Sequence, residues 1–228
     1  MEHSARKHIA WLVFGLSFGL LFMGALRFSA VHPTILTPLS KYATIGYVLI
    51  TVIFTVFLVR SGLPLNRFGF GLRFDLRQFL LACAAVLTLR IFAYALNPLV
   101  EALLGSARNL ERFADVQGSA SSLILLLIMN WTLAAFGEEF AYRIVLMRGI
   151  SFVFQDTFKG QIIAVLIQAA FFGLIHAYQG PTGIVGSAFS GLVFGAVTLA
   201  GRWSIWPSAL AHGINNTFGI FALYYGSY

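Results

Sequence analysis

The sequence predicts an all-α, polytopic bundle of about seven transmembrane helices, and three observations carry that prediction. Of the 228 residues, 59% are hydrophobic and only 10% are charged, and the mean hydropathy is +0.84. A soluble domain averages about 25% charged residues, so this composition does not fit a soluble core. The apolar residues form runs near the ~20 that a spanning helix needs. Helices satisfy their own backbone hydrogen bonds in lipid, and the alternation of an outer-membrane barrel is missing.

Each predicted span is an apolar run, and three of the runs have further sequence features that bear on their structure. The first follows a basic head like that of a signal peptide, but no clear cleavage site follows it, so we expect a retained span. Arg90 and Asn97-Pro98 interrupt the third run, and a split there would give an eighth element. Gly191 and Gly195 in the sixth are spaced for close helix contact. The predicted spans are about 9–29, 42–60, 78–103, 121–147, 161–178, 183–200 and 204–225.

Two polar stretches, 61–78 and 105–119, are expected to be loops or interfacial helices. The first mixes apolar residues with arginines, which is typical of an amphipathic segment on the membrane surface. No repeat or linker divides the chain, so we expect one integral membrane domain over residues 1–228. Cys83 is the single cysteine, which excludes an intrachain disulfide and a multi-cysteine metal site.

The basic residues predict how the chain is oriented. With the N-terminus in the cytoplasm, nine Lys and Arg residues fall in inner loops and three in outer loops, as the positive-inside bias requires. This bias and lipid headgroups explain the net charge of +7, so no nucleic-acid partner is expected. Small size and the lack of organellar signals favour a prokaryotic plasma membrane. The inner set is Arg6, Lys7, Arg60, Arg67, Arg73, Arg77, Arg148, Lys159 and Arg202, and the outer set is Lys41, Arg108 and Arg112.

An acidic pair and an arginine, Glu138, Glu139 and Arg143, lie inside the fourth apolar run. Ionised groups at membrane depth are costly unless paired or wetted, so they are functional candidates. On a helix, Glu139 and Arg143 are four residues apart and can pair. Glu138 points about 100° away and stays available as a general base. The alternative is an Arg–Glu pair that only joins helices, and the second glutamate weakens that interpretation.

Two histidines follow in later apolar runs. His176 ends the fifth run, with Phe172 four residues earlier on the same helix face. His212 and Asn216 lie side by side in the seventh and offer a ring N–H and an amide N–H₂. Such donors orient water or stabilise an oxyanion, although polar pairs in membranes also join helices and a histidine at a span end is often interfacial. Taken together, these groups favour hydrolysis by an activated water.

A metal is the open alternative for this set. Glu138, His176 and His212 would be the ligands if zinc were present, since imidazole and carboxylate suit that ion. The H-E-x-x-H motif is absent, and the spacing does not demand a metal, so none is assigned. No serine lies in a G-x-S-x-G context, and Cys83 is distant in sequence from the acidic and histidine clusters.

The motifs resemble, in order, those of the CPBP family, which comprises CAAX proteases and bacteriocin-processing enzymes and is also called Abi. The matching residues lie roughly between 130 and 219, and residues 121–225 would hold the catalytic core. The motifs are Glu138-Glu139-x3-Arg143, Phe172-x3-His176 and His212-x3-Asn216, with further similarity in Arg202-Trp203-Ser204-Ile205-Trp206-Pro207.

This resemblance implies a CAAX-type intramembrane endopeptidase acting on a membrane-associated protein or peptide, of the glutamic or the metalloprotease type. By the resemblance, Glu138 activates water with help from His176, and His212 and Asn216 form the oxyanion site. Glu139 and Arg143 would position Glu138. Two alternatives remain: a proton- or ion-coupled transporter, and a non-catalytic immunity or scaffold protein of the same fold.

The depths of the site residues along their predicted helices do not agree with one another. At about 1.5 Å per residue, Glu138 and His212 lie about 14 Å and 12 Å from the inner ends of their spans, but His176 lies about 22 Å away. A tilt, different span ends or a water-filled cavity must absorb the difference.

Overall fold

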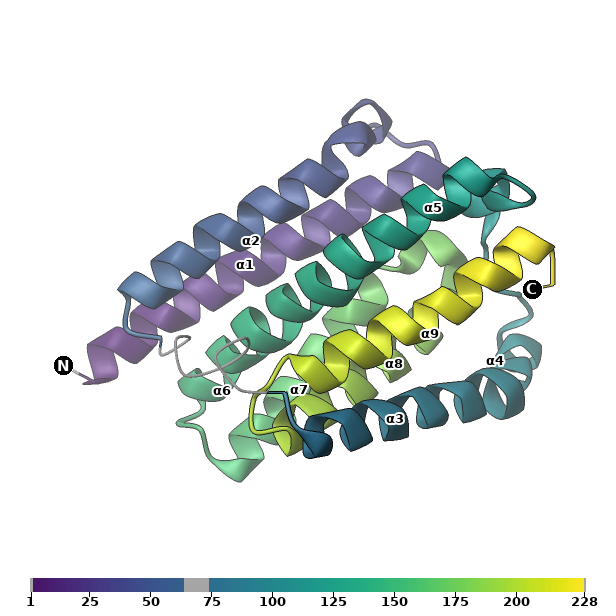
Figure 1. The fold of residues 1–228 in the computed structure, drawn as a ribbon. Coiled ribbons are helices and arrows are strands. Elements are labelled where there is room, and N and C mark those ends of the chain that lie inside the picture. Colours follow the sequence, from purple (N-terminus) through teal and green to yellow (C-terminus); the bar gives the residue numbers. More distant parts are fainter. Residues whose placement is uncertain (1, 64–73, 228) are drawn as a thin grey trace.

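The computed structural model describes residues 2–63 and 74–227, and every regular element within these ranges is a helix. The all-α prediction is therefore confirmed. The predicted amphipathic surface segment at 61–78 falls largely outside the described residues. Two long helices begin the bundle: α1 (Glu2–Val31) runs along α2 (Ala43–Arg60), and a short 3-10 turn, η1 (Thr37–Tyr42), joins them (Figure 1).

The third predicted span is one helical span, Leu76–Leu104, and the interruption that the sequence indicates is a change of helix geometry within it, not a split. Asp75 caps α3 (Leu76–Ile91) by accepting a hydrogen bond from the Gln78 N–H at 3.1 Å. A π-helical turn, η3 (Phe92–Leu96), then leads to α4 (Asn97–Leu104), where proline occupies the first turn. Gly105 ends α4 at φ +64°, the left-handed conformation that glycine adopts without strain.

The fourth span is the element that carries the acidic pair. It begins with α5 (Ala120–Met129) and continues through two π-helical stretches, η5 (Asn130–Glu138) and η6 (Phe140–Met147), into α6 (Arg148–Val153). Helix geometry of the π type often occurs at functional sites. The element ends six residues beyond the predicted boundary at 147.

The last three helices complete the core. Thr157 caps α7 (Phe158–Leu174), a short turn η7 (Ala177–Gln179) follows, and α8 (Gly180–Ala200) packs along α7. Gly191 of the predicted close-contact pair lies so near Ala169 of α7 that an added Cβ would be 2.8 Å from its Cα. The final helix is α9 (Trp206–Tyr225), which packs against α3, α8 and η5.

Among the described residues, five helices are long and apolar enough to cross a membrane. They cover the predicted first to fourth and sixth spans: Ala5–Val31, Thr37–Arg60, Leu76–Leu104, Ala120–Val153 and Ala177–Ala200. The fifth predicted span is the shorter apolar helix α7, and the seventh is α9, which carries the polar residues His212, Asn215 and Asn216. The exact number of spans therefore stays a prediction.

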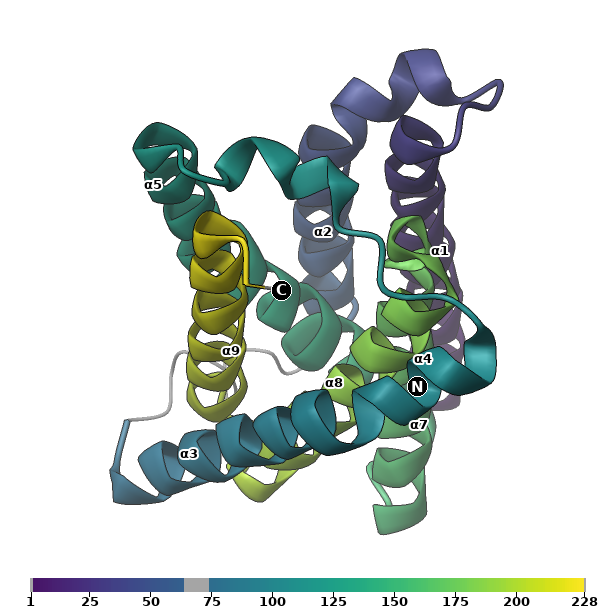
Figure 2. The ribbon, with the colours of Figure 1, turned by 90° about the vertical axis from the view of Figure 1, so that its right-hand side faces the viewer.

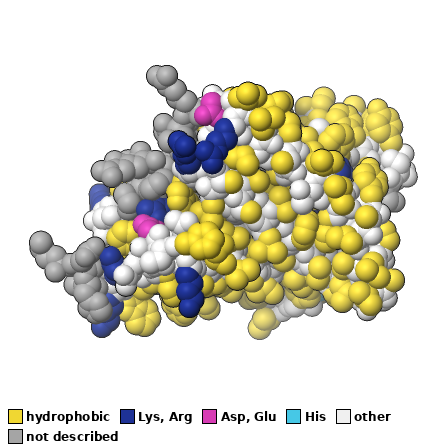
Figure 3. Space-filling view, turned by 90° about the horizontal axis from the view of Figure 1, so that it is seen from below, with side chains coloured by type: hydrophobic (Ala, Val, Ile, Leu, Met, Phe, Trp, Pro, Cys, Tyr) yellow, Lys and Arg dark blue, Asp and Glu magenta, His cyan; other side chains and the backbone are white. Residues whose placement is uncertain are grey.

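The two ends of the bundle differ. The N-terminus and the end of α2 lie at one end, and the α1–α2 connection, the start of α5 and the C-terminus lie at the other (Figure 1). A segment containing the 3-10 helix η4 (Glu111–Val116) crosses this second end (Figure 2). Apolar side chains cover most of the face in Figure 3, and Lys and Arg gather toward one end of it. This apolar surface suits a multi-pass membrane protein.

Candidate functional site

The structure brings the predicted polar residues to one cavity of about 340 Å³. A volume of this size lies within the range of small-molecule and peptide sites. Glu138, Phe172, His176, His212 and Asn216 all line it, although they come from three separate parts of the chain. The two other predicted residues, Glu139 and Arg143, lie behind this wall and are fully buried.

Glu139 is held between two partners. Its Oε2 lies 3.1 Å from Nε of Arg143, which is the predicted pair, and its Oε1 lies 2.7 Å from Nδ1 of His212. An ionised carboxylate only accepts hydrogen bonds, so Nδ1 of His212 carries the proton in this contact. The second ring nitrogen, Nε2, is then unprotonated in the neutral ring. Glu139 therefore fixes both the orientation and the tautomer of His212.

Aromatic rings pack against the Arg143 guanidinium. Its central carbon lies 4.4 Å from the ring centre of Phe172 and 5.2 Å from that of Phe194. The face of an aromatic ring attracts a cation, and the attraction is larger when water is excluded. Phe194 also stacks on His212 with ring centres 4.9 Å apart. The same rings thus hold the cation and the imidazole in place.

Glu138 has a different partner, which the sequence reasoning did not find. Its Oε1 lies 3.2 Å from Nη1 of Arg27, a residue of α1 that is 111 positions away. The resemblance implied that Glu139 and Arg143 would position Glu138, but the contact in the structure is with Arg27. An arginine at membrane depth is itself a functional signal, and that signal was available in the sequence. The Arg27 contact uses Oε1, and Oε2 takes no part in it.

His176 lies in the turn after α7. Its Nδ1 is 2.7 Å from the backbone carbonyl oxygen of Phe172. A carbonyl only accepts, so Nδ1 carries the hydrogen and the neutral ring keeps an unprotonated Nε2. The depth mismatch of about 10 Å expected from the sequence does not separate His176 from the other residues, because His176 lines one cavity with Glu138 and His212.

Two asparagines position α9 against its neighbours. Asn130 donates to the Gly213 carbonyl at 3.0 Å and to the Thr217 hydroxyl at 3.3 Å, which ties η5 to α9. Asn215 accepts a hydrogen bond from the Arg90 guanidinium of α3 and also lines the cavity. Asn216 lines the cavity, and within the described part of the chain no hydrogen bond uses its amide. Its N–H₂ therefore remains available to a ligand.

The cavity is also lined by arginines that the sequence did not identify as site residues. Arg27, Arg90, Arg108 and Arg112 line it, and Glu138 is the one carboxylate among the described residues that do so. Arg108 donates from Nε to Oε1 of Gln179 at 2.7 Å. This links the 105–119 stretch to the turn that holds His176.

The described residues contain no group of three His, Cys, Asp or Glu side chains placed to hold a metal ion. Glu138 is engaged with Arg27, and His212 uses Nδ1 on Glu139. The conditional zinc set of Glu138, His176 and His212 is therefore not assembled as a ligand sphere in this conformation.

Residues 120–218 match the model of the family described as type II CAAX prenyl endopeptidase Rce1-like. The matched segment holds every motif on which the CPBP resemblance depends, so that resemblance is confirmed at the level of the family. The chain matches no curated protein and no solved structure.

Proposed function

Since residues 120–218 match the Rce1-like family of type II CAAX prenyl endopeptidases, we propose that the chain is an intramembrane endopeptidase. It hydrolyses a peptide bond in a membrane-associated protein or peptide. The observation that carries the proposal is the convergence of Glu138, His176, His212 and Asn216 on one cavity. A base, two imidazoles and an amide donor around a space of this size suit water attack on an amide.

In the proposed reaction, Glu138 is the general base. Arg27 holds its Oε1, so Oε2 accepts a proton from a water molecule while the water oxygen attacks the scissile carbonyl carbon. The unprotonated Nε2 of His176 accepts the second hydrogen bond of that water. The proton then passes from Glu138 to the leaving amine nitrogen when the carbon–nitrogen bond breaks. Atoms and charge balance without any further reagent.

The oxyanion of the tetrahedral intermediate is stabilised on the α9 side. Asn216 donates from its amide N–H₂, which is a neutral donor in an enclosed site. His212 donates from Nε2 only as an imidazolium, because Nδ1–H is already given to Glu139. The Glu139 carboxylate at 2.7 Å stabilises that positive ring by Coulomb attraction. We therefore assign Glu139 and Arg143 to positioning His212, and Arg27 to positioning Glu138.

The test replaces Glu138 with glutamine, which keeps the side-chain shape and removes the base. New protein termini in membranes of cells that express the wild-type chain are compared, by mass spectrometry, with those from cells that express Glu138→Gln. We expect termini that require the wild-type chain to disappear, with unchanged protein level and membrane insertion. Asp115→Asn is the matched control, since Asp115 is an exposed carboxylate outside the cavity.

Two results contradict the proposal. If the wild-type chain produces no termini beyond those of the empty host, the non-catalytic scaffold or immunity alternative is favoured. If Glu138→Gln cleaves as well as the wild type, the hydrolytic role of this cavity is wrong.

The proposed substrates are proteins or peptides associated with the bilayer, and we propose a prokaryotic plasma membrane as the location of the protein.

We also propose that the N-terminal end of the bundle faces the cytoplasm and that the cavity opens on the opposite side. The N-terminal end carries the ends of the helices with most of the basic residues, and the positive-inside bias supports the orientation. The cavity is lined by residues of the other end, including Arg108, Arg112 and Tyr178. Its mouth would then face the extracytoplasmic side.

Cysteine labelling of intact cells checks this orientation. Cys83→Ser gives a chain without cysteine, into which Ser40→Cys or Lys159→Cys is introduced. A membrane-impermeant maleimide is expected to label the Ser40→Cys chain from outside and the Lys159→Cys chain only after lysis. The reverse pattern would invert the proposed topology.

A further inference from the structure

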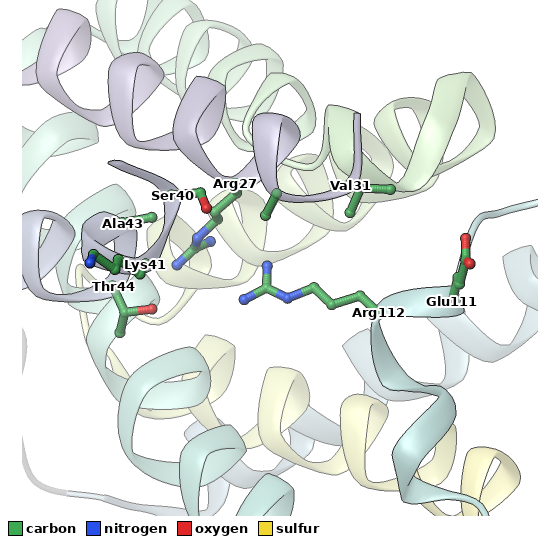
Figure 4. Close-up of a pocket in the computed structure, with 9 residues that line it drawn as sticks. Arg27, Val31, Ser40, Lys41, Ala43, Thr44, Glu111 and Arg112 are labelled. Carbon is green, nitrogen blue, oxygen red and sulfur yellow. The ribbon is translucent and has the colours of Figure 1, made fainter. Parts of the chain in front are cut away.

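A second cavity of about 480 Å³ lies at the end of the bundle where α1 meets α2, and we call it the vestibule. It is formed by the last turns of α1, by η1, by the start of α2 and by η4 (Figure 4). Its lining is mostly polar. The lining residues are Arg27, Ala30, Val31, Ser40, Lys41, Ala43, Thr44, Glu111 and Arg112.

Two positive charges face one another across the vestibule. The guanidinium groups of Arg27 and Arg112 point toward the same space, whereas the Glu111 carboxylate turns away from it (Figure 4). Lys41 adds a third cation to the lining. Like charges that share a cavity repel each other, and an anion placed between them removes the repulsion.

Of the three vestibule cations, only Arg27 has an ion pair within the described residues. Arg27 is paired with Glu138, and this one carboxylate serves the catalytic cavity. Arg112 has no ion pair among the residues that the structure describes, and its guanidinium lies 5.2 Å from the ring centre of Tyr178. A flat guanidinium presents a fork of N–H donors that matches a carboxylate. The Arg112 guanidinium is therefore available to a carboxylate that enters the vestibule.

The vestibule adjoins the catalytic cavity. Arg27, Thr44 and Arg112 line both spaces. A group bound in the vestibule therefore lies beside the arginine that positions Glu138. Only alanine and valine side chains supply its apolar lining, which offers no wall for two acyl chains. These features favour a group of the peptide substrate over a lipid headgroup.

We propose that the vestibule binds a carboxylate of the substrate close to the scissile bond, through Arg112, Arg27 and Lys41. That the bound group belongs to a substrate rests on the proposed endopeptidase function. The binding site itself is inferred from the positions of the three cations. The carboxylate is either an acidic side chain or the C-terminus of the peptide. The site thereby selects peptides with a negative charge next to the bond that is cut.

Binding is tested without cleavage, by thermal unfolding of the full chain in a neutral detergent. The probes are N-acetylated tetraalanine with a free carboxylate, the same peptide as its C-terminal amide, and an amidated analogue with one glutamate. We expect at least one carboxylate peptide to raise the unfolding midpoint while the uncharged amide does not. The free acid and the glutamate analogue distinguish a terminal carboxylate from a side-chain carboxylate.

Variants assign the effect to the vestibule. Arg112→Gln is expected to weaken the peptide effect by about tenfold to a hundredfold, the size of a lost charge-assisted contact. Arg112→Lys keeps the charge and is expected to retain part of it. Lys159→Gln, at the other end of the bundle, is the matched control and is expected to bind as the wild type. The unfolding midpoints without peptide report whether each variant folds.

Three outcomes would overturn the proposal. The first is an equal response to the acid and amide peptides, and the second is an unchanged response in Arg112→Gln. The third is a midpoint raised by dioctanoyl-phosphatidylglycerol in an Arg112-dependent way, with no response to any peptide, which would indicate a lipid site instead. Loss of cleavage in Glu138→Gln is a separate measurement, so the two proposals fail independently.

Discussion

The part of the chain that matches the family model and the part before it contribute opposite chemistry to one cavity. Residues 120–218 supply the lining carboxylate, the imidazoles and the asparagine amides, at Glu138, His176, His212, Asn130, Asn215 and Asn216. Residues before 120 supply all four arginines of the lining, Arg27, Arg90, Arg108 and Arg112. The matched region therefore carries the reactive groups, and the unmatched region carries the positive charge that surrounds them.

This difference teaches that the site is larger than the motifs that identify it. Within the matched region, Glu139, Arg143 and His212 form a self-contained, buried set. Glu138, by contrast, depends on Arg27 from the first helix. Substitutions in the buried set of Glu139, Arg143 and His212 are thus expected to fail by loss of folding. Substitutions of the arginines before residue 120 are expected to fail by loss of activity or selectivity.

The largest effect is expected from Arg143→Met in the matched region. This change leaves Glu139 buried without its cation, and breaking a buried pair costs about 3–5 kcal/mol. We expect a strongly lowered unfolding midpoint in detergent and little folded protein. Arg148→Met, at another buried arginine of the same element, gives a comparison for the loss of a guanidinium that does not contact Glu139. A midpoint equal to that of the wild type would show that the pair does not stabilise the fold.

An intermediate effect is expected from Arg27→Gln in the unmatched region. Charge-assisted hydrogen bonds contribute about 1.5–3 kcal/mol, so loss of this contact to Glu138 is expected to lower cleavage by roughly tenfold to a hundredfold. The fold is expected to survive, because Glu138 faces the cavity and can contact water. Cleavage is measured by the same new termini. Activity at the wild-type level would mean that the first helix does not position the base.

The smallest effect is expected where α7 and α8 pack within the matched region. An added Cβ at Gly191 would lie 2.8 Å from the Ala169 Cα, so Gly191→Ala is expected to destabilise by about 1–3 kcal/mol. Gly186 in the same helix has its nearest neighbour, a Phe92 ring atom, at 3.9 Å. Gly186→Ala is therefore expected to be neutral or slightly stabilising, by up to about 1 kcal/mol. Equal midpoints for the two variants would contradict a close helix contact at Gly191.

Much of the helical architecture follows from the sequence. Long apolar runs have to be helices in lipid because the backbone has no other partner there. Asn97-Pro98 predicted the interruption before α4, and Gly191 predicted the close approach to α7. The boundary at 147 was wrong because the residues of α6 are buried through protein contacts, which hydropathy does not register. The polar residues of α9 likewise lower the hydropathy of the last predicted span, so hydropathy alone does not identify α9 as a spanning helix.

The candidate site was predictable where its members are neighbours on one helix. The spacing of Glu139 and Arg143 determines that they meet, because residues four apart lie on one helix face. The spacing of His212 and Asn216 likewise puts both at the cavity. The partners that Glu138 and Glu139 contact on other helices could not be derived from spacing along one helix. The choice of Arg27 for Glu138 and of His212 for Glu139 depends on contacts across 111 and 73 positions.

The sequence by itself therefore determined a helical membrane protein and the kinds of chemical group that it carries into the bilayer. Composition and local spacing are sufficient for that, because lipid enforces helices and a helix fixes its own faces. Only the tertiary structure decided that the arginines before residue 120 surround the carboxylate and imidazoles after it. The reason is physical: the pairing of distant charges depends on how helices pack, and that packing is set by contacts that no local pattern encodes.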